Sequence, residues 1–302
     1  MTIRPGAPVV VAVDGSASAL EAVRVAAREA VTRGRPLRVV HAFIWPLYDV
    51  SLAPAPGAPL HAGLRHEAEQ FVAEAVTEAG KVAPELTVTS AVVDGAATPV
   101  LLTHSRDAVL LVLGSRGLGG FGGLLIGSVA VQVSAHADCP VLVVKGEGRA
   151  DGPVLVGVDG SDLSTEALKF AFEEASLRGT DLVAVHAWII PVAPSDLLPV
   201  AYDVEALVAE EERVLAEALA GWSERYPDVP VRHRVAYGAP ARMLVEESAT
   251  AQLTVVGARG RGALAGMLLG SVSHAVLHHS QSPVAIVRRR REDRKDRKDR
   301  KD

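Results

Sequence analysis

The stretch Val9-Val-Val-Ala-Val-Asp-Gly-Ser16 decides the fold of this chain. A run of apolar residues that ends in Asp-Gly is typical of a buried strand followed by a turn. The same pattern returns 145 residues later as Val154-Leu-Val-Gly-Val-Asp-Gly-Ser161. The chain therefore contains two copies of one structural unit, each beginning with this pattern.

Other segments repeat in the same order, as expected of an internal duplication. The offset between the copies drifts only from 145 to 143 residues. With 302 residues, the chain has room for two domains of about 150 residues each. We predict a first domain at residues 1–146 and a second at 152–287, separated by a Gly-rich charged stretch. The further repeated pairs are Leu37–Ala42 with Leu182–Ala187, Gly114–Gly117 with Gly257–Gly260, Leu124–Val129 with Met267–Val272, and Pro140–Val144 with Pro283–Val287.

Strand-like and helix-like segments alternate within each copy. Such alternation predicts a parallel sheet with right-handed crossovers and helices on both faces. The fold class is therefore α/β, with two tandem doubly wound parallel-sheet domains. In the first copy we expect strands at Val9–Val13, Leu37–Phe43, Thr87–Val93, Val109–Leu113 and Val141–Val144, and helices from Ser16 or Ser18 to Thr32, over Gly63–Gly80, Val100–Arg106 and Ser128–His136.

A Gly-rich segment follows the fourth strand of each copy, where ligands of such sheets bind. It reads Gly-x2-Gly-x9-Gly-Ser in both copies. We expect its glycines to bring the backbone close to phosphate oxygens and to adopt positive φ. The Gly-Ser step opens a helix whose N–H groups and dipole favour an anion. An arginine in the loop adds a cation. These residues are Gly114, Arg116, Gly117, Gly127 and Ser128, and then Gly257, Arg259, Gly260, Gly270 and Ser271.

This loop, an upstream Val-Asp-Gly-Ser and a second strand ending in Val-His-Ala together resemble the ATP-binding branch of the universal stress protein family. The resemblance covers roughly residues 7–145 and 152–287. It implies a Rossmann-like, adenine-nucleotide α-hydrolase-like fold, bound ATP, a homodimer formed through the last strands and a role in stress or growth-state response. The downstream protein stays unknown.

The resemblance also implies roles for single residues. Asp14 and Asp159 would lie near the ribose and phosphates and could hold Mg²⁺ through ATP, although no metal site is certain. Backbone at Ala42 and Ala187 would meet the adenine edge. The implied set is Val13, Asp14, Ala42, Gly114, Arg116, Gly117, Gly127, Ser128 and Val129, with Val158, Asp159, Ala187, Gly257, Arg259, Gly260, Gly270, Ser271 and Val272 in the second copy.

We expect ATP to be held without significant turnover, because the loop lacks the lysine of a Walker motif and no second carboxylate is evidently placed to position water. The alternatives are a slow ATPase or phosphotransferase, and a dimeric scaffold with degenerate sites. Gly117–Gly122 also fits a dinucleotide fingerprint, but that motif belongs after the first strand and must open a helix directly.

Composition excludes several other classes. The net charge is −5, yet the last fifteen residues hold ten basic and five acidic side chains, so the rest of the chain carries −10. An acidic body does not suit a nucleic-acid binder. Residues 288–302 lack any apolar side chain and are predicted to be a disordered charged tail. We expect no signal peptide and no membrane span, and the lone Cys139 favours a reducing cytoplasm.

The remaining candidates concern histidines, strand edges and long loops. His41 and His186 are predicted to pack against backbone, and His274 and His278 to lie on a helix surface or interface rather than in a zinc site. The last strands could pair two chains, or each other within one chain. Two Pro-rich loops, residues 45–59 and 188–199, could be flaps over the nucleotide or plain connectors.

Overall fold

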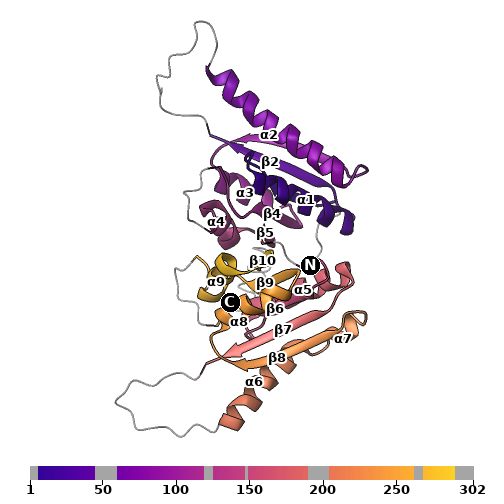
Figure 1. Cartoon of the computed structure of the whole chain (residues 1–302), viewed down its shortest axis with the longest axis vertical. Coiled ribbons are helices and arrows are strands. Elements are labelled where there is room, and N and C mark those ends of the chain that lie inside the picture. The colour runs from indigo at the N-terminus through magenta and orange to yellow at the C-terminus, as the bar shows by residue number, and fades with distance from the viewer. Residues whose placement is uncertain are drawn as a thin grey trace, which may run out of the picture. The chain divides into compact units, whose positions relative to one another are not determined.

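A computed structural model of the chain describes residues 6–44, 60–118, 125–146, 149–189, 204–261 and 268–289. Strands and helices alternate along this part of the chain (Figure 1). The chain divides into two compact units between Lys145 and Gly146. Residues 45–59 and 190–199 of the Pro-rich segments, the middle of each Gly-rich loop and the tail from residue 290 lie outside the described residues. Trp188, where the sequence predicts the start of the second Pro-rich loop, instead ends a strand.

The first unit is a five-stranded parallel sheet. Its strand order is β3-β2-β1-β4-β5, with Val9 of β1 opposite Leu37 of β2 and Leu110 of β4. Helices α1 and α2 contact each other, and so do α3 and α4, so the sheet is wound on both faces. The elements are β1 (Val9–Ala12), α1 (Ala17–Thr32), β2 (Leu37–Phe43), α2 (Leu60–Val82), β3 (Val88–Asp94), α3 (Ala97–Ser105), β4 (Leu110–Gly114), α4 (Ser128–His136) and β5 (Val141–Val144).

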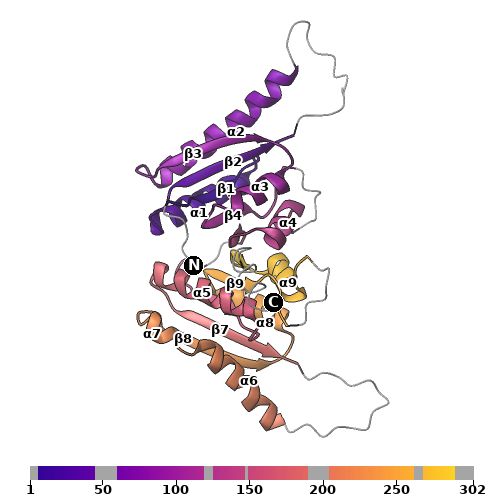
Figure 2. The ribbon, with the colours of Figure 1, turned by 180° about the vertical axis from the view of Figure 1, so that it is seen from behind.

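The second unit repeats this plan, seen from behind in Figure 2. Its strand order is β8-β7-β6-β9-β10, again parallel wherever the pairing is described. The predicted fold class is confirmed in both units. The elements are β6 (Val154–Gly157), α5 (Asp162–Arg178), β7 (Leu182–Trp188), α6 (Val204–Leu219), α7 (Trp222–Arg225), β8 (Val231–Tyr237), α8 (Pro240–Glu247), a 3₁₀ turn (Ser248–Thr250), β9 (Leu253–Gly257), α9 (Ser271–His279) and β10 (Val284–Val287).

Serine caps fix where the first helix of each unit begins. The side chain of Ser16 accepts a hydrogen bond from the N–H of Ala19 over 3.1 Å, and Ser161 caps α5 in the same way. These bonds satisfy N–H groups that have no partner within the helix. Each helix therefore begins right after the Asp-Gly-Ser turn, as the sequence predicts. The cap holds this turn between the end of the strand and the start of the helix.

Short helix α7 has no predicted counterpart and carries an aromatic stack. The Trp222 ring lies parallel to that of the buried Phe172, with centroids 5.1 Å apart, and Tyr226 stacks on the same ring at 5.5 Å. Such pairs add to the stability gained by burying their area. The stack therefore packs α7 against α5 in the second unit.

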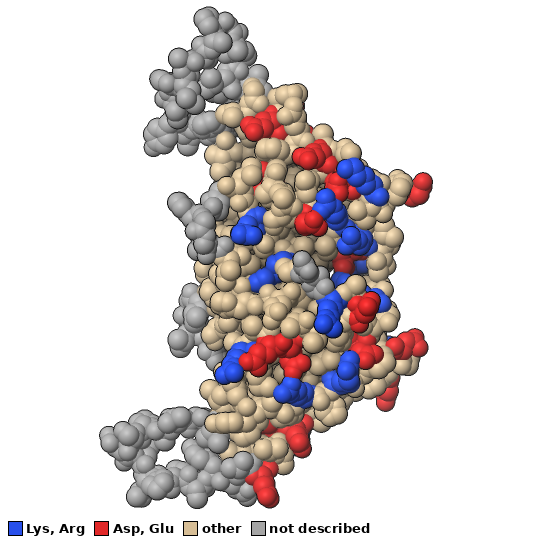
Figure 3. Space-filling model, viewed as in Figure 1, with Lys and Arg blue, Asp and Glu red and all other residues tan. Residues whose placement is uncertain are grey.

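Valine-rich central strands form the core of each unit. Val9, Val11, Val154 and Val156 are fully buried, and so is the thiol of Cys139. On the face shown in Figure 3, acidic and basic side chains are interspersed without a continuous basic stripe among the described residues. No described helix is long and apolar enough to cross a membrane.

Candidate functional site

The carboxyl ends of β1, β2 and β4 meet at one edge of the first sheet. There they line a cavity of about 490 Å³, together with the starts of α3 and α4. Every residue that the sequence predicts for the first site lines this cavity: Val13, Asp14, Ala42, Gly114, Arg116, Gly117, Gly127, Ser128 and Val129.

The lining of this cavity combines two kinds of group. Some are small and apolar side chains, among them Val40, Ala97 and Leu101. Others belong to the loop Gly114–Gly117 and the first turn of α4, where the helix presents N–H groups without an acceptor inside the helix. A cavity lined by both apolar and anion-binding groups suits an amphiphilic ligand such as a nucleotide.

Asp14 ties the Gly-rich loop to the turn after β1. Its Oδ1 accepts from the N–H of Ser16 over 3.1 Å, and its Oδ2 accepts from the N–H of Leu118 over 2.9 Å. A Cβ on Gly117 would lie 2.2 Å from Oδ2. Glycine is therefore required at position 117 by the close approach of this carboxylate.

The second unit repeats this tether. Oδ1 of Asp159 accepts from the N–H of Ser161, and Oδ2 accepts from that of Arg261, both over 2.9 Å. A Cβ on Gly260 would again lie 2.2 Å from the carboxylate. Burial alone would raise the pKa of Asp159, but the hydrogen bonds from Ser161 and Arg261 outweigh it, and the pKa lies below its ordinary value.

The expectation of positive φ is wrong for the described glycines of the two Gly-rich loops. None of Gly114, Gly117, Gly127, Gly257, Gly260 and Gly270 has a positive φ. Positive φ occurs instead in the Asp-Gly-Ser turns, at Gly15 and Gly160. At Gly114, Gly117 and Gly260 glycine is favoured because neighbouring groups approach closely, whereas a Cβ on Gly127 would meet no atom nearer than 3.7 Å. A Cβ on Gly114, for example, would lie 2.6 Å from Oγ of Ser18.

The end of the loop is fixed by its own backbone. The N–H of Gly127 donates to the carbonyl of Ser115 over 2.8 Å, and that of Gly270 to the carbonyl of Ala258 over 2.9 Å. Gly127 and Gly270 are the N-cap residues of α4 and α9, and neither helix has a side-chain cap. The first N–H groups of both helices therefore have no side-chain acceptor, and Ser128 and Ser271 begin the helices as predicted.

His41 and His186 pack against backbone as predicted. Nδ1 of His41 lies 2.8 Å from the carbonyl oxygen of Val13, and Nδ1 of His186 lies 2.7 Å from that of Val158. Each histidine holds the end of a neighbouring strand in place. In the second unit Nε2 of His186 also contacts Oε2 of Glu211 at 2.7 Å, a contact the sequence did not reveal.

Several lining residues were missed by the sequence reasoning. Ala97 and Leu101 line the cavity. Oγ of Ser18 accepts a hydrogen bond from the N–H of Arg116, and the N–H of Leu118 donates to Asp14. One available signal is the pair Gly95-Ala96, which recurs as Gly238-Ala239 at the 143-residue offset before α3 and α8.

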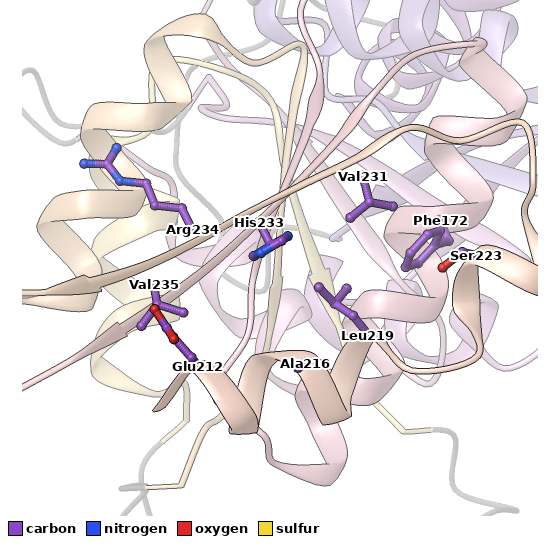
Figure 4. Close-up of a pocket in the computed structure, with 9 residues that line it drawn as sticks. All are labelled: Phe172, Glu212, Ala216, Leu219, Ser223, Val231, His233, Arg234 and Val235. Carbon is purple, nitrogen blue, oxygen red and sulfur yellow. The ribbon is translucent and has the colours of Figure 1, made fainter. Parts of the chain in front are cut away.

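A second cavity, of about 750 Å³, lies in the second unit between α6 and the outer strand β8 (Figure 4). Phe172, Leu219 and Val231 form its apolar part. Its polar groups include the exposed side chains of His233 and Glu212. No glycine loop lines it among the described residues, the only helix start beside it is that of the four-residue α7 at Ser223, and the carboxylate of Glu212 would repel a phosphate. The cavity of the first unit is therefore the better nucleotide site.

Within the described ranges, no group of three or more His, Cys, Asp or Glu side chains is arranged to hold a metal ion. The rings of His274 and His278 stack on α9, with centroids 4.4 Å apart. Of the predicted tail, Arg288 and Arg289 are described and have contacts, whereas residues 290–302 lie outside the described part.

The chain matches a known family along most of its length. The model of the universal stress protein family matches residues 7–145 and 152–288. A universal stress protein of Mycobacterium tuberculosis is 44% identical over 295 residues, which cover 93% of this chain and 97% of the relative. A second one from the same organism is 43% identical over 291 residues, with 93% and 96% covered.

Solved structures agree on the fold. The crystal structure of a universal stress protein from Archaeoglobus fulgidus matches with a TM-score of 0.66 at 21% identity, covering 94% of this chain and 99% of that one. The family model and these relatives confirm the resemblance to the universal stress protein family. This chain belongs to the universal stress protein family, with one family domain in each of its two halves.

Proposed function

We propose that this protein holds ATP in two sites, one in each unit, as a stress-response or growth-state regulator. The observation that carries the proposal is the cavity in the first unit, which all nine residues of the first predicted site line. Its apolar lining residues, among them Ala42, Ala97 and Leu101, would take the adenine. Its loop and the first turn of α4 would take the phosphates.

The second site is supported by the repeated tether. Asp159, Gly260 and the N–H of Arg261 have the same arrangement as Asp14, Gly117 and the N–H of Leu118. Since the loop geometry depends on these contacts, both loops would present the same donors to phosphate. Arg116 and Arg259 would add one cation each.

Retention of ATP is part of the proposal. Both carboxylate oxygens of Asp14 already accept backbone N–H groups, so this side chain acts first as a loop anchor. His41 faces a carbonyl oxygen through Nδ1 and an aromatic ring, Phe71, at 5.7 Å. Neither group is arranged to activate water. Mg²⁺ would be held mainly by the phosphates, with Asp14 or Asp159 nearby.

The test of ligand identity is extraction of the purified protein. Acid releases the bound nucleotide, and chromatography against standards identifies it. We expect ATP at close to two molecules per chain when extraction follows incubation with ATP and removal of excess. Another nucleotide, or none, would overturn the proposal.

A homodimer is also proposed, and light scattering measures it. A chain of 31.6 kDa should give twice that mass. The mass of a single chain at micromolar concentration would contradict the dimer while leaving ATP binding unaffected.

A further inference from the structure

The helix that precedes the outer strand packs differently in the two units. In the first unit, α2 contacts α1 and the strands β2 and β3, and it buries Ala68, Val72, Ala75 and Ala79 at helical spacing. Of the described side chains of α6, only that of Leu215 is buried. Helix α6 therefore packs less closely on its sheet than α2 does, and the cavity of about 750 Å³ lies between α6 and β8 (Figure 4).

A pair of aromatic residues accounts for this difference. Phe172 and Trp222, which stack at 5.1 Å, stand where the first unit has the fully buried Ala27 and Ala79. Two rings need more room than two methyl groups, so the stack keeps the end of α6 away from α5. The helix also breaks at Gly221, whose φ is +77°, whereas α2 continues through the same position.

Three polar side chains line this cavity without a partner in the described part of the chain. His233 lies on the face of β8 toward α6, while Arg234 leaves the opposite face and pairs with Glu247 (Figure 4). Glu212 comes from α6, and Ser223 from the first turn of α7. No described residue is hydrogen-bonded or ion-paired to the side chains of Glu212, Ser223 and His233. Free polar groups around an apolar base are typical of a small-molecule site.

The charges of the surrounding elements favour a cationic ligand. Helix α6 carries five glutamates and one arginine. Glu210 and Glu217 pair with this arginine and Glu211 contacts His186, so Glu212 is the carboxylate that α6 leaves for the cavity. Elsewhere around the cavity, α5 holds four acidic and two basic residues, α7 holds one of each, and the two arginines of β8 pair with Asp181 and Glu247.

From this geometry we infer that the cavity between α6 and β8 is a further ligand site, which takes a small amphiphile with a ring-bearing apolar body and a protonated amine. The body lies on Leu219 and Val231, and the ammonium group donates to Glu212. The volume falls within the roughly 300–1,000 Å³ of ordinary ligand pockets. The site shares no residue with the nucleotide cavity of the first unit, so it does not depend on the proposed ATP binding.

Three compounds with the same indole ring test the charge of the ligand. Tryptamine carries an ammonium group, tryptophol a hydroxyl group and indole-3-acetate a carboxylate. Titration calorimetry of the full chain is done at pH 8, where an ordinary imidazole is neutral and an aliphatic amine is protonated. We expect tryptamine to bind about tenfold more tightly than tryptophol, and indole-3-acetate to bind more weakly than tryptophol.

Matched substitutions in the two units locate the site. Glu212→Gln should remove the advantage of tryptamine and leave the affinity for tryptophol unchanged. Ala216→Trp, at an exposed position that lines the cavity, should fill it and abolish the binding of both compounds. The controls are Glu69→Gln and Ala73→Trp, which change the same positions of α2 in the first unit. Circular dichroism checks that each variant folds.

The outcomes separate this site from any other. A tenfold preference for tryptamine that is lost in Glu212→Gln and kept in Glu69→Gln supports the inference. Equal affinities for the three compounds, a loss shared by the control, binding that persists in the folded Ala216→Trp variant, or no saturable binding by the unmodified chain would overturn it. The ATP sites are measured by their own titration, so the proposed function stands or fails separately.

Discussion

The backbone N–H of Leu118 donates a 2.9 Å hydrogen bond to Oδ2 of Asp14 across 104 positions of sequence. This bond joins the turn after β1 to the Gly-rich loop after β4. It also brings the carboxylate so close to Gly117 that no side chain fits there. The aspartate of the motif therefore shapes the phosphate loop, whatever it contributes to the ligand directly.

Substituting the second loop glycine should empty one site at a time. Gly117→Asp places a carboxylate against Asp14, displaces the loop and repels phosphate, so the number of ATP molecules bound per chain should fall from two to one. Gly260→Asp should do the same in the second unit. Gly80→Ala is the control, because a Cβ there meets nothing within 4 Å. Unchanged stoichiometry in both loop variants would contradict the assignment of the loops.

The lowered pKa of Asp159 predicts a pH-dependent stability of the second unit. Because the folded pKa is below the ordinary 3.8, ionised Asp159 stabilises the fold at pH values above 3.8. This stabilisation disappears as the pH falls through the lower, folded pKa. Asp159→Asn should therefore cost about 1–2 kcal/mol at pH 7 and much less at the acid end.

Urea unfolding followed by tryptophan fluorescence measures this difference in a Trp45→Phe background, because the other two tryptophans, Trp188 and Trp222, both lie in the second unit. An equal loss of stability at pH 7 and in acid would show that the effect comes from packing and not from the charge.

Several parts of the fold could be predicted from the sequence because they depend on local patterns. Valine-rich runs fix β1 and β6, and Ser16 and Ser161 mark the starts of α1 and α5. The offset of the copies places both Gly-rich loops. Patterns of this kind depend only on residues close together in the sequence, so they can be recognised before the structure is known.

The features that could not be predicted from the sequence depend on contacts between segments that are far apart in the chain. The reason for glycine at position 117 lies in Asp14, and no local pattern distinguishes this close approach from a positive φ. The contact between His186 and Glu211, and the place of Arg261 over Gly160, need the packing of α6 against the strands. Helix α7 is four residues long and too short for a periodic signal.

Hydrolysis should be absent or very slow. Phosphoryl transfer needs a positioned nucleophile and a metal clamp, and the carboxylates of Asp14 and Asp159 are already engaged by backbone N–H groups. Phosphate release under saturating ATP and Mg²⁺ should stay well below about 1 s⁻¹, the low end for enzymes. Faster turnover that disappears in the Asp14→Ala/Asp159→Ala double variant would make the protein an ATPase.

The central claim, two ATP sites built on two equivalent loops, is tested most directly by titration calorimetry of the unmodified chain with ATP. The account predicts two ATP molecules per chain, with each loop-glycine variant reduced to one. Saturating ATP at a hundred times the dissociation constant should also stabilise each unit by about 2.7 kcal/mol. Fewer than one ATP per chain, with no change in thermal stability, would contradict it.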